Sequence, residues 1–132
     1  MVRFGKPSSN RHLGVFGSLV VAPNEAVSPM PYYFSSGLVA YGPMECRPKD
    51  FVAFGLAYGA YSSQLRSEQS SQQNAGAPVL PQLYEMTVEL SYGIQVLPGL
   101  IIQPGAQMLV NPGGNPGTPS ALALGVNAVV SF

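Results

Sequence analysis

Residues 84–96 alternate strictly between two kinds of side chain, and this pattern restricts the fold more than any other feature of the sequence. One set is apolar: Tyr84, Met86, Val88, Leu90, Tyr92, Ile94 and Val96. The other is polar or small: Glu85, Thr87, Glu89, Ser91, Gly93 and Gln95. Because successive side chains of a β-strand point to opposite faces, the pattern predicts a strand with one wholly apolar face. The segment exceeds the usual ~5–6 residues of a globular strand and suits a tilted membrane-spanning strand, which needs ~9–11.

The same period of two recurs, less regularly, elsewhere in the chain. The further segments are residues 122–132, 100–110, 51–61, 13–21 and 32–41. Together with residues 84–96, they predict six antiparallel strands and an all-β fold. Pro104 lies inside one of these segments. Because proline has no N–H to give to a neighbouring strand, it predicts a bulge or local irregularity there.

The composition indicates which surroundings and which chemistry suit the chain. Charged residues make up only 9%, whereas soluble domains carry roughly 25%, so we expect the apolar faces to meet lipid. Six basic residues balance six acidic ones, without the basic cluster that nucleic-acid binding requires. Cys46 is the single cysteine and His12 the single histidine. Neither belongs to a recognisable metal-ligand or catalytic set, so we predict no metal, no cofactor and no catalytic residue.

The connections between the predicted strands alternate in length. Residues 22–31, 62–83 and 111–120 form the longer set, and residues 42–50 and 97–99 form the shorter one. Outer-membrane barrels have short periplasmic turns and longer external loops, so we expect the shorter set on the periplasmic side. Residues 62–78 are rich in Ser and Gln, a composition typical of a solvated, mobile loop.

Six strands are too few for a closed transmembrane barrel, which takes at least ~8. An open sheet in lipid would leave edge N–H and C=O groups unpaired. We therefore expect residues 1–132 to be the C-terminal part of one barrel domain, with upstream strands missing. Residues 1–14 lack the apolar stretch of a secretory signal, so a signal peptide is expected upstream as well. Association of several copies into one barrel is the alternative.

Three stretches of the sequence resemble the carbohydrate-selective porin family of Gram-negative bacteria. They are RPKDF with the following AFGLAYGAYS, the run YEMTVELSYGIQVLPGLIIQPGAQMLVNPGG, and the closing ALALGVNAVVSF. The resemblance covers residues 47–132. It implies an antiparallel transmembrane β-barrel of about sixteen strands in the bacterial outer membrane, through which sugars diffuse passively. It also implies that Phe132 belongs to the signal read by the barrel-assembly machinery. Whether the barrels form homo-oligomers is left open.

Polar residues on the non-apolar side of the predicted strands are candidates for lining an aqueous channel. They are Glu85, Thr87, Glu89, Gln95, Gln103, Gln107 and Asn127. Their side chains can form hydrogen bonds with water and with sugar hydroxyls, although a merely hydrated wall is an equal alternative. Glu85 and Glu89 lie about 13 Å apart along one face. That is too far for the carboxylate pair of a glycosidase, which needs ~5–9.5 Å.

Aromatic residues near the predicted strand ends are expected at the membrane interfaces. They are Tyr41, Tyr58, Tyr61, Tyr84 and Tyr92. Amphipathic rings favour the headgroup region, where barrels carry aromatic girdles. Stacking against sugar is the alternative role for such rings.

The sequence therefore favours passive diffusion of small hydrophilic solutes, with sugars implied by the resemblance and lipid as the surrounding partner. A soluble β-sandwich binding module also has alternating strands, but its outer face should carry more charge. A third alternative is a structural or adhesive barrel whose lumen is blocked. An enzyme is the least favoured reading.

Overall fold

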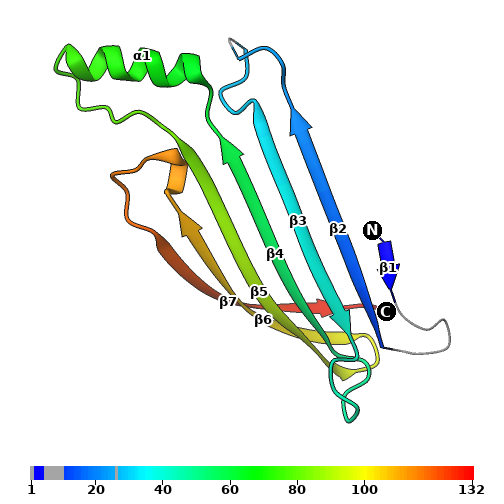
Figure 1. Ribbon diagram of the computed structural model, residues 1–132. Coiled ribbons are helices and arrows are strands. Elements are labelled where there is room, and N and C mark those ends of the chain that lie inside the picture. The colour runs from blue at the N-terminus through cyan, green and yellow to red at the C-terminus, as the bar shows by residue number, and fades with distance from the viewer. Residues whose placement is uncertain (1, 5–10, 26) are drawn as a thin grey trace.

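The residues that the computed structural model describes, 2–4, 11–25 and 27–132, form one antiparallel β-sheet (Figure 1). Its strands are β1 (Val2–Phe4), β2 (His12–Val21), β3 (Tyr32–Tyr41), β4 (Phe51–Ala60), β5 (Tyr84–Leu97), β6 (Leu100–Val110) and β7 (Ala121–Val130). Each strand pairs with the next one along the chain. The all-β antiparallel fold is confirmed, and the six predicted strands are β2 to β7 with small shifts at their ends.

The sheet has a seventh strand that the sequence pattern did not reveal. β1 pairs with β2 through Val2↔Val15 and Phe4↔Leu13. Three residues are too few to display a period of two, so β1 carries no recognisable signal. Within the described residues, β1 and β7 lie at the two edges, and the sheet is open.

The Ser- and Gln-rich loop between β4 and β5 contains a helix, so the prediction of a mobile loop there was wrong. Helix α1 (Ser63–Asn74) begins after Ser62, whose hydroxyl accepts a hydrogen bond from the Leu65 N–H at 3.1 Å. Such a cap satisfies one of the free N–H groups at a helix start. The chain leaves the helix near Gly76, which has a φ of 90°. Gln, Arg, Leu and Glu are good helix formers, and this local preference outweighs the low sequence complexity.

No bulge forms at Pro104, but the expected local irregularity is present there. β5 and β6 pair in a constant register as far as Ser91↔Gly105 and again from Ile94↔Ile102, so the pairing with β5 is interrupted at Pro104 and Gln103. A shift of the register occurs further along, between Gln95 and Leu97. On its other side, Pro104 pairs with Val126 of β7.

The connections gather at two opposite ends of the sheet (Figure 1). One end holds the loops β2–β3, β4–β5 with α1, and β6–β7 with the short 3₁₀ helix η1 (Pro112–Gly114). These loops are joined by backbone hydrogen bonds, from Ser62 N to Pro29 O at 2.9 Å and from Leu83 N to Gly114 O at 2.8 Å. We call this the loop end. The other, the turn end, holds the β3–β4 connection and the tight turn at Pro98 and Gly99.

The sheet has no apolar interior of its own. No hydrophobic side chain among the described residues is buried. Large apolar side chains are instead exposed, for example Leu19 at 68% and Leu124 at 76%. A β-sandwich would bury one face of each sheet against the other, and the described chain contains a single sheet. Within those same residues, no helix has the length and apolar character needed to cross a membrane.

Candidate solute-contacting wall

The strand register divides the side chains of the sheet into two faces. Directly paired residues of neighbouring strands point to the same side. One row across the sheet is Phe16, Gly37, Gly55, Glu89, Gln107 and Ala123. We call the side that bears this row the polar face and the opposite side the apolar face. Phe34, Tyr58, Met86 and Val110 form one row of the apolar face.

The register places all seven candidate channel-lining residues on the polar face. They are Glu85, Thr87, Glu89, Gln95, Gln103, Gln107 and Asn127. Gln103 and Asn127 are direct cross-strand partners, as are Glu89 and Gln107. The remaining positions of this face are mostly Gly, Ala and Ser, which leave room above the backbone. Residues far apart in sequence therefore contribute to one polar, open surface.

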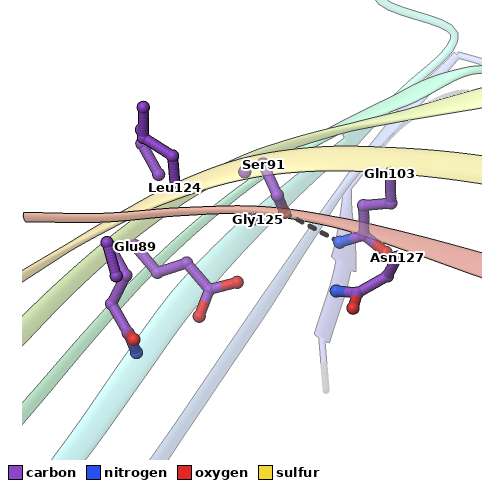
Figure 2. A pocket seen from close by; sticks show the side chains of 10 residues that line it. Glu89, Ser91, Gln103, Leu124, Gly125 and Asn127 are labelled. Atoms are coloured by element: carbon purple, nitrogen blue, oxygen red, sulfur yellow. Dashed lines mark hydrogen bonds between the residues drawn. The ribbon is translucent and has the colours of Figure 1, made fainter.

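Four of these seven residues lie, together with Ser91, around one hollow of about 240 Å³ on β5, β6 and β7. Its lining includes Glu89, Ser91, Gln103, Gln107 and Asn127. Figure 2 shows the side chains of Glu89, Gln103 and Asn127 on one side of the sheet and that of Leu124 on the other. The hollow offers carboxylate, hydroxyl and amide groups, which can accept or donate hydrogen bonds to hydroxylated solutes.

Ser91 and Gln103 form the fixed part of this hollow. The Gln103 side-chain amide donates to the Ser91 hydroxyl at 2.8 Å (Figure 2), and Ser91 is only 5% exposed. A buried hydroxyl requires a partner, and Gln103 supplies it. This bond holds the Gln103 amide in one orientation, so that its carbonyl oxygen stays available as an acceptor.

The two glutamates of β5 have different surroundings, although sequence places them in the same set. Glu85 lies at the loop end, where its carboxylate accepts a hydrogen bond from the Gly113 N–H at 2.5 Å. Glu89 lies in the middle of the strand, is exposed, and has no hydrogen-bond or ion-pair partner among the residues that the structure describes. Glu85 therefore anchors η1, whereas Glu89 keeps its full capacity to accept hydrogen bonds from solvent or solute.

Sequence reasoning missed Phe16 as part of the polar face. Its ring lies against the Gly37 backbone, so closely that a Cβ on Gly37 would collide with it. Phe16 lines a second hollow of about 290 Å³ together with Glu89, Thr87 and Gln107. An aromatic residue that interrupts a row of small residues was the signal available in the sequence. It became interpretable only once the register aligned Phe16 with Glu89.

The five tyrosines predicted at membrane interfaces do not share one face. Tyr58 and Tyr84 stack at a centroid distance of 5.6 Å, and with Tyr92 they belong to the apolar face. Tyr41 lies on the polar face, stacked on His12 at 4.3 Å. Tyr61 follows β4 and its ring packs on the Gly114 backbone. Of the five tyrosines, only Tyr58, Tyr84 and Tyr92 therefore lie on the apolar face.

A buried carboxylate organises the turn end of the sheet. Asp50 is 2% exposed and accepts hydrogen bonds from Arg47 Nε at 2.5 Å, the Tyr92 hydroxyl at 2.9 Å and the Gln95 N–H at 3.0 Å. The Arg47 hydrogen bond is the main cause that lowers the pKa of Asp50, against the opposing effect of burial. This cluster, which we call the Asp50 clamp, fastens the β3–β4 connection to β5.

The candidate wall carries polar and charged side chains that do not form a recognisable metal-binding set among the described residues. In the described part of the chain, no three His, Cys, Asp or Glu side chains are grouped so as to hold a metal ion. Cys46 is an exposed free thiol in the β3–β4 connection. The side chains that face the hollows are those that bind water and polar solutes reversibly.

A single antiparallel sheet of long strands with a polar face of small residues and an exposed apolar face is typical of a porin barrel wall. The sequence matches the carbohydrate-selective porin, OprB family, over residues 1–132. The chain belongs to this family.

Two relatives support the assignment. Porin B of Pseudomonas aeruginosa is 29% identical over an alignment of 132 positions that covers 94% of this chain. The high-pH structure of Pseudomonas putida OprB matches with a TM-score of 0.85 and 30% identity over 93% of this chain. The chain spans only 29% of the first protein and 31% of the second. It thus corresponds to about three tenths of these porins.

Proposed function

We propose that this chain forms part of the wall of an outer-membrane pore through which small hydrophilic solutes, sugars in particular, diffuse passively. The observation that carries the proposal is the division of one sheet into a polar face and an exposed apolar face. Hydrocarbon would cover the apolar face, whereas the polar face would border water. The family description as carbohydrate-selective points to sugars as the solutes.

The polar face supplies the channel-lining residues in this proposal. Glu89, Gln103, Gln107 and Asn127 would exchange hydrogen bonds with passing solutes, while Glu85 and Gln95 lie nearer the two ends of β5. On the apolar face, Tyr58 and Tyr84 at the loop end and Tyr92 near the turn end would lie at the two headgroup regions. The turn end would then face the periplasm and the loop end, with α1, the exterior.

A complete barrel requires further strands beside β1 and β7. Unpaired edge groups are costly in lipid, so both edges would be paired by strands of the same gene product, upstream of the described sheet, or by further copies. A signal peptide would precede those strands. Phe132, which follows β7 and is fully exposed, would be presented to the barrel-assembly machinery.

Reconstitution of the full gene product into liposomes tests the proposal. Liposomes that contain the protein should swell in isosmotic glucose at a rate that rises with protein content, and lipid-only vesicles should not. Planar bilayers should show stepwise ionic conductance. A protein that stays folded and monomeric in buffer without detergent, or inserts without conductance, would contradict it. The second outcome would favour a blocked structural barrel.

A further inference from the structure

An open strip of glycine backbone separates Phe16 from Glu89 on the polar face. Both residues belong to the same cross-strand row, in which Gly37 and Gly55 stand between them. At a strand spacing of about 4.8 Å, their Cα atoms lie roughly 14 Å apart. An added Cβ on Gly55 would meet nothing within 4 Å. The backbone of β3 and β4 is thus the floor of a shallow site with a different side chain at each end.

The aromatic end of the strip is held in place by packing. The Phe16 ring leans over Gly37, whose lack of a side chain permits the close approach. Phe16 nevertheless remains 43% exposed. A ring that is fixed on one side and exposed on the other presents apolar surface without a large loss of conformational entropy on binding.

The polar end of the strip carries a free acceptor. Glu89 lines two hollows that also include Phe16 and Gly55, one with Gln107 toward the loop end and the other with Ser91 and Gln103 toward the turn end. Within the described chain, Glu89 has no bonding partner. A single carboxylate is a poor cation site, because divalent ions take several oxygen ligands. A carboxylate flanked by amides instead suits a group that presents several hydroxyl donors.

We propose that the row from Phe16 to Glu89 is a subsite for one neutral sugar ring, which lies on the Gly55 backbone. The apolar C–H face of the ring contacts Phe16, and its hydroxyls donate to the Glu89 carboxylate. Apolar contact at one end and hydrogen bonds at the other match the two kinds of surface that a sugar presents. The inference rests on the proposed function, since solutes reach this face only if it borders the pore.

Sugar-dependent block of ion conductance measures binding to this subsite. The full gene product is studied in planar bilayers, and the reduction of its ion conductance is measured as glucose is added. For each variant the reduction is expressed as a fraction of the conductance without glucose. The half-saturating concentration is the glucose concentration that gives half of the maximal reduction. Phe16→Ala removes the apolar contact and Glu89→Gln removes the charged acceptor. Each should raise the half-saturating concentration by roughly five- to tenfold.

Phe34→Ala is the matched control for Phe16→Ala. Phe34 has a similar exposure of 40% but lies on the apolar face, so its removal should leave the half-saturating concentration unchanged. Gly55→Val provides a second, independent test. It leaves Phe16 and Glu89 intact, fills the open floor with a side chain, and should raise the half-saturating concentration as much as Phe16→Ala does.

The outcomes separate the subsite from the pore itself. If the unmodified protein does not conduct ions or pass glucose, the proposed function fails and the subsite with it. If it conducts and passes glucose but shows no saturable block, the subsite is overturned and the pore stands. The same holds if Phe16→Ala, Glu89→Gln and Gly55→Val all retain the half-saturating concentration of Phe34→Ala.

Discussion

Asp50 and Glu89 are two carboxylates of one sheet with opposite surroundings. Asp50 is buried at the turn end and bonded by Arg47, Tyr92 and Gln95. Glu89 is exposed in the middle of β5 and has no partner in the described part of the chain. A buried charge must be paired, so the hydrogen bonds of Asp50 stabilise the fold and are not available to a solute. An exposed charge without partners contributes little to folding and remains available to solvent or solute.

The contrast between Asp50 and Glu89 shows that the ends of the sheet stabilise the fold, whereas its middle contributes less to stability. The sheet buries no hydrophobic side chain among its described residues, so local polar clusters and tight turns must fix the connections. These clusters lie at the ends, at the Asp50 clamp and at the contacts between the loops. The middle of the polar face consists mainly of small residues and of polar groups, of which Gln103 and Ser91 bond to each other and Glu89 has no partner in the described chain.

Asp50→Ala should produce the largest loss of stability. It leaves the partly buried Tyr92 hydroxyl and Gln95 N–H without their acceptor, at an expected cost of about 1–3 kcal/mol in the free energy of unfolding. Urea unfolding of the full gene product in lipid vesicles measures it. Lys49→Ala is the control, since Lys49 is exposed beside it in the same connection. Equal unfolding midpoints for the two variants would show that the Asp50 clamp does not stabilise the sheet.

Two glycines extend the comparison between the turn end and the mid-wall. Gly99 has a φ of 81°, and a Cβ there would collide with the Ser131 backbone oxygen, whereas a Cβ on Gly55 meets open space. Gly99→Ala should therefore destabilise the protein by about 1–2 kcal/mol, and Gly55→Ala should be nearly neutral. The same unfolding assay compares them. A larger loss at Gly55 would mean that the mid-wall is packed as tightly as the turn.

Acid should weaken the turn end through protonation of Asp50. The pKa of Asp50 is lowered in the folded protein, so its stabilising contribution is complete above the unfolded value of ~3.9 and is lost as pH falls through the folded value. The unfolding midpoint should accordingly drop below about pH 4. Glu25 also has a lowered pKa, because Ser63 donates to its carboxylate. Asp50→Asn therefore isolates the part due to Asp50, and an unaltered pH profile in that variant would contradict the assignment.

The sequence predicted the positions of the long strands even where the alternation is less regular. β3 and β6 have both expected ends, and β5 begins at the expected Tyr84. β1 was missed because three residues show no period, and α1 was missed because low complexity was taken as disorder. That segment is helical because Ser62 caps its first turn and because it contains good helix formers.

The candidate site was predictable in its chemistry but not in its arrangement. A period of two identifies the face on which Glu89, Gln103 and Asn127 lie, and the structure places them together. Which residues stand side by side depends on the register, which the turns determine and the period does not. For that reason Phe16 was not recognised beside Glu89. The burial of Asp50 was equally hidden, because Arg47 and Asp50 look like ordinary turn residues in the sequence.

Glu89→Gln should have the smallest effect on stability and a specific effect on conduction. Since Glu89 has no partner to lose, the free energy of unfolding should change by less than about 0.5 kcal/mol. The variant removes the only mid-strand charge of β2 to β7, so the preference of the pore for cations should fall. The reversal potential across a KCl gradient measures that preference, and Glu68→Gln on helix α1 is the matched control for loss of one negative charge. If Glu89→Gln lowers stability as Asp50→Ala does, the two carboxylates share a structural role; if both glutamine variants give the same reversal potential, Glu89 does not face the ion path.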